Sequence, residues 1–149
     1  MTATREDVFR PATTADADAL TALERDTNLV ALAHVFPDVP YPYDEVRERW
    51  VRLLADAEVR VEVAGPSGRL DVYLAWDDQR LRHVGVRPEL WGRGLARRAV
   101  ERPNGVRRLW VLRDNERARG FYEHLGWTPT GSEQRAEWPP YPVEVEYGR

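Results

Sequence analysis

The chain has 149 residues and a formal net charge of −3; it contains no cysteine, and all 22 of its basic residues are arginine. The length fits one domain, residues 1–149, with a proper hydrophobic core, and the charge argues against general affinity for nucleic acid. Without cysteine there is no disulfide framework, no cysteine-ligated metal and no thioester on the protein, and without lysine no Schiff base can form. The three histidines, His34, His83 and His124, show no metal-ligand spacing, so we expect no metal site.

No apolar segment approaches the length of a membrane span, and no signal peptide is visible. We therefore expect a soluble, cytoplasmic protein without a membrane partner. The sequence leaves the choice between a monomer and a homodimer open.

The first half of the chain predicts alternating strands and two helices. Thr13 or Thr14 can cap the first helix, in whose first turn Asp16 is favourable. Prolines recur every two or three residues over 36–43, which excludes a helix there, and the second helix begins at about Asp44, its expected N-cap. Strands are expected at 8–10, 59–64, 70–76 and 81–86, the last three as an antiparallel run.

The second half predicts two helices between strands. A glycine turn over 92–96 opens a helix of about three turns that must end before Pro103. Asn115 caps the last helix, and Gly126 fits the left-handed position that ends it. Strands are expected at 106–112, 128–136 and 143–147, and the first of these, the most apolar, is expected to be central and parallel to the strand at 81–86.

The glycine turn has the properties of an anion site. Glycines between a strand and a helix let backbone N–H groups crowd around an anion, and the helix N-terminus adds roughly half a positive charge. Arg93, Arg97 and Arg98 strengthen the positive field, so a phosphate or pyrophosphate is the expected guest. The turn is not a P-loop, because no Gly-Lys-Ser/Thr ends it, and it lacks the third glycine of the dinucleotide fingerprint.

This turn resembles motif A of the GNAT N-acetyltransferases, Val-x-Pro-x-x-Arg/Gln-Gly-x-Gly-x-Gly/Ala. Here the motif reads Val86-Arg87-Pro88-Glu89-Leu90-Trp91-Gly92-Arg93-Gly94-Leu95-Ala96. Trp91 stands where the family has Arg or Gln. The backbone amides that carry most of the family's cofactor binding do not depend on that side chain.

A second segment, at the family's spacing, is similar to the pattern Asn-x-x-Ala-x-x-Phe-Tyr-x-x-x-Gly-Phe. It reads Asn115-Glu116-Arg117-Ala118-Arg119-Gly120-Phe121-Tyr122-Glu123-His124-Leu125-Gly126-Trp127. The resemblance covers nearly the whole chain. It implies an α/β (α+β) GNAT fold: a central mixed, mostly antiparallel twisted sheet of about seven strands, flanked by four helices and splayed at an acetyl-CoA site.

The resemblance also implies roles for particular residues. Tyr122 aligns with the tyrosine that protonates the departing thiolate in many members, although the helix alone would make it an ordinary core aromatic. Asn115 aligns with an asparagine that contacts the pantetheine, a role compatible with capping. The residues expected to contact acetyl-CoA are Val84, Gly85, Val86, Trp91, Gly92, Arg93, Gly94, Leu95, Ala96, Arg97, Asn115 and Tyr122.

The proton acceptor and the amine acceptor are less defined. His83 lies on the strand beside the thioester and titrates in the right range, but a lone strand histidine is more often structural, and many members use a water chain. Glu133, Glu137 and Glu144 could attract a cationic amine or be solvated. The two loops rich in proline and aromatic residues would wall the acceptor pocket through Phe36, Tyr41, Tyr43, Trp138 and Tyr141, or form a rigid cover over the core.

The leading hypothesis is an acetyl-CoA-dependent N-acetyltransferase that acts by direct transfer to an amine, carried by a small molecule or a peptide. Two alternatives stay open: a non-catalytic module that binds CoA or acyl-CoA, and an acyltransferase that uses another acyl-CoA.

Overall fold

The computed structural model describes residues 8–36 and 38–149 and contains one seven-stranded sheet in the order β1-β2-β3-β4-β5-β7-β6. All neighbouring strands are antiparallel except β4 and β5, which are parallel. The expected mixed, mostly antiparallel sheet with four flanking helices is confirmed. The strands are β1 (Phe9–Pro11), β2 (Arg60–Ala64), β3 (Val72–Trp76), β4 (Arg80–Val86), β5 (Arg108–Leu112), β6 (Thr128–Arg135) and β7 (Val143–Gly148).

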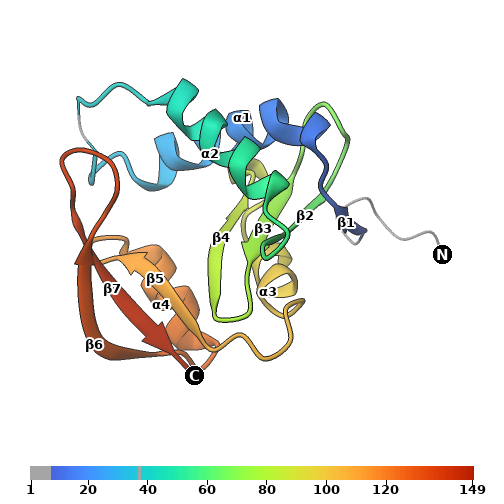
Figure 1. Ribbon diagram of the computed structural model, residues 1–149. Helices are drawn as coiled ribbons and strands as arrows, with labels where there is room; N and C mark the ends of the chain where they lie inside the picture. The colour runs from blue at the N-terminus through green and yellow to red at the C-terminus, as the bar shows by residue number, and fades with distance from the viewer. Residues whose placement is uncertain (1–7, 37) are drawn as a thin grey trace.

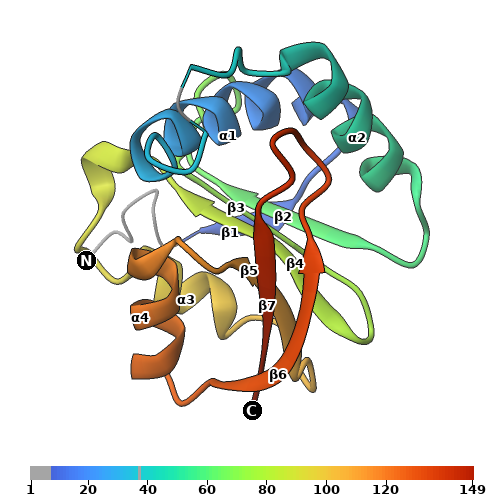
Figure 2. The same cartoon turned by 90° about the vertical axis from the view of Figure 1, so that its left-hand side faces the viewer.

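Helices cover both faces of the sheet, α1 (Ala17–Ala31) and α2 (Tyr43–Ala55) on one, α3 (Leu95–Val100) and α4 (Glu116–His124) on the other (Figures 1 and 2). Strand β3 is buried along its whole length because its alternate side chains enter two cores. Tyr73 and Ala75 pack with Trp50 of α2, whereas Leu74 packs with Leu95 of α3. The two-sided burial explains why the strand is apolar at every position.

Strands β4 and β5 are joined over only part of their length. Their register pairs are Arg80 with Arg108 and Leu81 with Leu109. Beyond these residues β4 continues to Val86 on its β3 side, and β5 continues to Leu112 on its β7 side. The sheet therefore splays between β4 and β5, as expected, and leaves facing backbone edges that do not pair with each other.

The helices differ from the expectation in two places. Helix α3 has six residues rather than about three turns, because Gly92 and Gly94 have positive φ angles of 83° and 79° and cannot belong to it. Helix α2 begins at Tyr43 with Pro42 as its N-cap, so Asp44 lies in the first turn and not at the cap. In the parts of the chain that the structure describes, no helix combines the length and apolar character needed to cross a membrane.

Candidate active site

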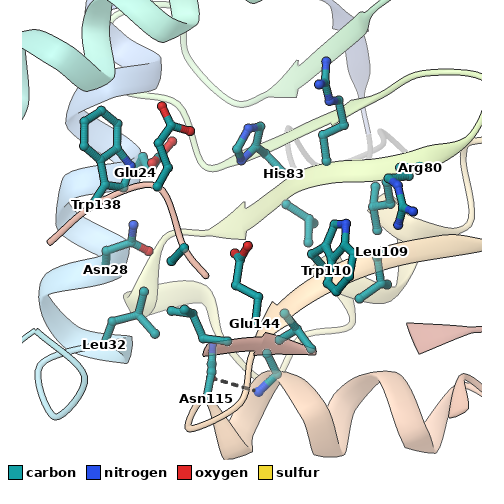
Figure 3. Close-up of a pocket in the computed structure, with 18 of the residues that line it drawn as sticks. Glu24, Asn28, Leu32, Arg80, His83, Leu109, Trp110, Asn115, Trp138 and Glu144 are labelled. Carbon is teal, nitrogen blue, oxygen red and sulfur yellow. Dashed lines mark hydrogen bonds between the residues drawn. The ribbon is translucent and has the colours of Figure 1, made fainter. Parts of the chain in front are cut away.

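A cavity of about 640 Å³ opens where β4 and β5 separate. It brings together four residues that the sequence predicted for catalysis or cofactor contact, His83 and Val84 of β4 with Asn115, the N-cap of α4, and Tyr122 in its last turn. Figure 3 shows His83 and Glu24 directed into this cavity, with Trp138 beside Glu24. The splayed strands thus form a cavity whose walls carry groups able to exchange protons.

His83 occupies the β4 side of the cavity. Its ring centroid lies 5.4 Å from that of Trp50 on α2, and it pairs through the backbone with Ala75 of β3. Burial lowers the pKa of His83 well below its usual 6.5, and the positive charges of Arg49 and Arg82 lower it further. The imidazole is therefore neutral near pH 7 and has a lone pair that can accept a proton, but it is a weaker base than an unperturbed histidine, contrary to the expectation that it titrates in the right range.

Tyr122 of α4 lines the same cavity. It is buried against Phe121 and Trp127, whose ring centroids are 5.2 and 6.1 Å from its own. Burial raises the pKa of Tyr122 above its usual 10, so the hydroxyl keeps its proton at neutral pH. At the start of the same helix, Asn115 Oδ1 accepts a hydrogen bond of 3.1 Å from Ala118 N–H, which confirms the predicted cap and leaves the side-chain amide free to donate.

The glycine turn after β4 is open on its outer side. A Cβ atom added to Gly92 or Gly94 would meet nothing within 4 Å. The first N–H groups of a helix have no partner within it, so the turn offers backbone donors beside free space. Leu95 packs its side chain in the core, and the exposed side chain of Arg97 pairs with Glu101 at 3.0 Å.

Trp91 makes two contacts within the protein. Its indole Nε1 donates a hydrogen bond of 2.8 Å to the carbonyl of Val86, and the guanidinium of Arg117 lies 3.7 Å from its ring centroid. Trp91 therefore links the glycine turn to the end of β4 and to α4. Val86 and Gly85 lie in the sheet beside it, paired with Val72 and Tyr73 of β3.

A second cavity, of about 450 Å³, lies between α1, the loop before α2 and the loop joining β6 to β7. The tip of that hairpin reaches towards α1 (Figure 2). Of the residues predicted to wall an acceptor pocket, Phe36, Tyr41, Trp138 and Tyr141 line this cavity, and Tyr43 does not. Tyr43 instead carries the guanidinium of Arg25 over its ring, 5.5 Å from the centroid.

The two cavities share part of their walls. Glu24 stands at this boundary, where its carboxylate accepts hydrogen bonds from Arg49 and from the indole of Trp50, the latter at 3.0 Å. The residues that line both cavities are Glu24, Asn28, Leu32, Phe36, Glu137 and Trp138. Of the three glutamates considered for attraction of an amine, Glu137 and Glu144 line the larger cavity, whereas Glu133 lies on the exposed strand β6.

Sequence reasoning missed Glu24, Asn28 and Arg49. A signal was present: Glu24 falls on the same helical face as the fully buried Leu20 and Leu23, and a carboxylate on an apolar face requires a partner. The partner, Arg49, lies beside Trp50 on the buried face of α2.

Comparisons with known proteins agree with this geometry. The family model described as an acetyltransferase (GNAT) domain matches residues 50–129, more than half of the chain. Among solved structures, an acetyltransferase from Thermus thermophilus is 22% identical, with a TM-score of 0.69 and 95% of each chain covered. The PaiA N-acetyltransferase from Thermoplasma acidophilum, solved with coenzyme A, is 13% identical, with a TM-score of 0.65, covering 95% of this chain and 98% of the other.

The ribosomal-protein-alanine N-acetyltransferase of Brucella melitensis is 18% identical, with a TM-score of 0.67, and 95% of this chain and 98% of the other are covered. The search of curated proteins found no match. The structural likenesses show the fold, and the family model covers the glycine turn, the splayed strands and α4. The chain belongs to the GNAT family of acetyltransferases.

Proposed function

We propose that this protein is an acetyl-CoA-dependent N-acetyltransferase that transfers the acetyl group directly to an amine. Family membership and the coenzyme A complex of the Thermoplasma acidophilum relative support a coenzyme A thioester as the cosubstrate. The observation that carries the proposal is the separation of β4 from β5, which places His83 and Tyr122 on the walls of one cavity adjoining a second one.

The cosubstrate would be held mainly by the backbone. The N–H groups of the turn over 92–97 would bind the pyrophosphate, as glycine turns at helix N-termini do, and Gly92 and Gly94 leave the space that this approach requires. The unpaired edge of β4 near Val84 would bind the pantetheine arm and polarise the thioester carbonyl, as backbone donors in an oxyanion hole do. The side-chain amide of Asn115 adds a donor at the opposite wall.

Two side chains would move the protons. Bond formation between the amine nitrogen and the carbonyl carbon releases a proton from the amine, which neutral His83 accepts at its free ring nitrogen. Cleavage of the carbon–sulfur bond sends the electron pair to sulfur, and the hydroxyl of Tyr122 donates a proton to the thiolate. Burial keeps Tyr122 protonated before the reaction begins, and the same burial makes it a weaker acid than a free phenol.

The first test is the thermal stability of the protein with acetyl-CoA. Ligand at a hundredfold its dissociation constant adds about 2.7 kcal/mol, which raises Tm by roughly 5–10 °C in a domain of this size. Gly94→Asp should abolish that shift, because the carboxylate would stand in the anion site. Gly105→Asp is the matched control, since Gly105 also has a positive φ, 76°, and open space around it but lies outside the site.

Release of free thiol in the presence of amines then tests transfer. A Tm shift without thiol release from any amine would leave a CoA-binding module, and no shift at millimolar acetyl-CoA would refute the proposed function.

A further inference from the structure

The smaller cavity combines apolar walls with a charge of one sign. Its apolar and aromatic lining residues are Leu29, Leu32, Ala33, Phe36, Val39, Pro40, Tyr41, Pro42, Val46, Trp138, Pro139 and Tyr141. The remaining described lining residues are Glu24, Asn28, Glu45 and Glu137, so every charged residue among them is acidic. We infer that the amine acceptor is a primary amine carried on a compact apolar or aromatic body, an inference that rests on the proposed function.

The distribution of the acidic groups places the amine end of this acceptor. Glu24 and Glu137 line both cavities and so lie at the boundary, Glu24 buried and Glu137 exposed, whereas Glu45 lines the smaller cavity alone. Asn28, Phe36 and Trp138 stand at the same boundary. Carbonyl and carboxylate oxygens accept hydrogen bonds from an amine, and aromatic faces attract an ammonium group. The amine therefore lies at the boundary and the apolar body behind it.

The same walls disfavour two other kinds of amine. A free amino acid carries a carboxylate beside its amine, hence at the boundary. Arg49 there is already paired with Glu24, and the described residues that line the smaller cavity include no Arg or His. A polyamine would place further ammonium groups among Val39, Pro40 and Val46, where the exposed Glu45 is the one further carboxylate among the described lining residues; burial of an ammonium group left unpaired is costly. Of the two boundary carboxylates, Glu24 is already compensated by Arg49, so Glu137 is the one that remains to attract a single ammonium group.

The size and rim of the cavity fit a compact ligand. About 450 Å³ is within the range of small-molecule sites. Leu29, Val39 and Tyr141 line it while 56%, 37% and 52% exposed, so its mouth is apolar as well. Large exposed apolar side chains gathered at one cavity mark a binding surface more than a solvated one.

The test is calorimetric titration of the CoA-saturated protein with four probes: 2-phenylethylamine, 2-phenylethanol, phenylalanine and spermidine. We expect 2-phenylethylamine to bind at least about tenfold more tightly than phenylalanine or spermidine, because each of the latter two would bury an unpaired charge. It should also bind more tightly than 2-phenylethanol, which lacks the ammonium group. Equal or tighter binding of spermidine or phenylalanine, or no binding of 2-phenylethylamine, would overturn the inference.

Tyr141→Asn locates the site. Tyr141 has a φ of 58°, which Asn tolerates, so the variant removes the ring with little added backbone strain. It should weaken 2-phenylethylamine about 3- to 10-fold, as loss of one aromatic contact does, and leave acetyl-CoA binding unchanged. Val51→Asn, at a similarly exposed residue of α2 outside the cavity, should change neither. Unchanged binding by Tyr141→Asn would contradict this location.

Thiol release from acetyl-CoA separates this inference from the proposed function. Acetylation of spermidine or phenylalanine in preference to 2-phenylethylamine would refute the acceptor class and leave the transferase standing. Tight binding of 2-phenylethylamine with no thiol release would leave the ligand class standing and refute transfer.

Discussion

Arg49 of α2 donates a hydrogen bond to the carboxylate of Glu24 on α1, and their side chains are only 10% and 8% exposed. The indole of Trp50 donates to the same carboxylate oxygen. This buried pair joins the two helices at the boundary between the cavities. Substitution of one partner by an uncharged residue would leave the charge of the other partner buried in the wall of the site.

Arg49→Met should destabilise the protein by about 3–5 kcal/mol, because it leaves the carboxylate of Glu24 buried without its cation. Urea unfolding measures this change. Arg47→Met is the matched control, since Arg47 lies on the exposed face of α2 and pairs with the exposed Asp18. The urea concentration at the midpoint of unfolding should be the same for this variant as for the wild type. The double variant Glu24→Leu/Arg49→Met should recover most of the lost stability, and a double variant as unstable as the single one would contradict the argument.

Tyr122→Phe should lower kcat by about 10²- to 10⁴-fold, the usual contribution of a general acid, while the thermal shift with acetyl-CoA is retained. Since burial raises the pKa of Tyr122, the wild-type kcat should show no decline from this group below about pH 10. Tyr147→Phe removes a hydroxyl that bonds to Arg119 and Glu123, outside the larger cavity, and should keep turnover. Equal kcat for wild type and Tyr122→Phe would exclude the assigned role.

Stability should decrease below about pH 6.5 because of His83. Its pKa is lowered in the folded state, so the unfolded chain binds a proton that the folded chain does not. The contribution of His83 to the free energy of unfolding is constant above the pKa of the unfolded chain. It falls as the pH drops below that value, by at most about 1.4 kcal/mol per pH unit for one proton. Urea unfolding at about pH 7.5 and about pH 5.5 measures the difference.

The matched variants for this pH dependence are His83→Gln and His34→Gln. The decrease in the free energy of unfolding from about pH 7.5 to about pH 5.5 should be smaller in His83→Gln than in the wild type. It should be unchanged in His34→Gln, where the substituted residue is exposed. The same slope in both variants would mean that other groups cause it.

Gly85→Ala should cost about 1–3 kcal/mol, as overpacking of a core does. A Cβ atom at Gly85 would lie 2.5 Å from the ring of Tyr73, its partner across the β3–β4 pair, and Tyr73 is buried against Trp50. Gly120→Ala, where the added atom meets nothing within 4 Å in helix α4, should instead stabilise the protein by about 0.5–1 kcal/mol. Thermal unfolding of both variants checks the pair, and a stabilised Gly85→Ala variant would contradict the close packing.

Much of the fold could be predicted from the sequence because the signals were local. Strands β2, β3 and β4 carry apolar alternation or continuous apolar residues and were expected within two residues of their bounds. Helix α3, Leu95–Val100, is shorter than the sequence predicts at both ends. Positive φ at Gly92 and Gly94 delays its start, and the residue before a proline avoids the helical region.

The site was predicted less completely because its contacts join distant segments. Residue patterns place His83 on a strand and Asn115 at a cap, but the separation of β4 from β5 came from the family resemblance alone. The bond from Trp91 to Val86 and its contact with Arg117 arise only when the turn and α4 meet. The roles of Tyr122 and of the glycine turn stay predictions that Tyr122→Phe and Gly94→Asp test, and the role of His83 as proton acceptor stays a prediction.

The short β4–β5 junction has a consequence for cooperativity. The sheet consists of two parts, one formed by β1, β2, β3 and β4 and the other by β5, β7 and β6. Between β4 and β5 these parts pair only at Arg80–Arg108 and Leu81–Leu109. A ligand that bonds to both open edges would act as an interior strand and tie the two parts together. Amide hydrogen exchange along β4 and β5 should therefore slow on ligand binding more than exchange along β2. The two parts of the sheet would then open less independently of each other when the site is occupied.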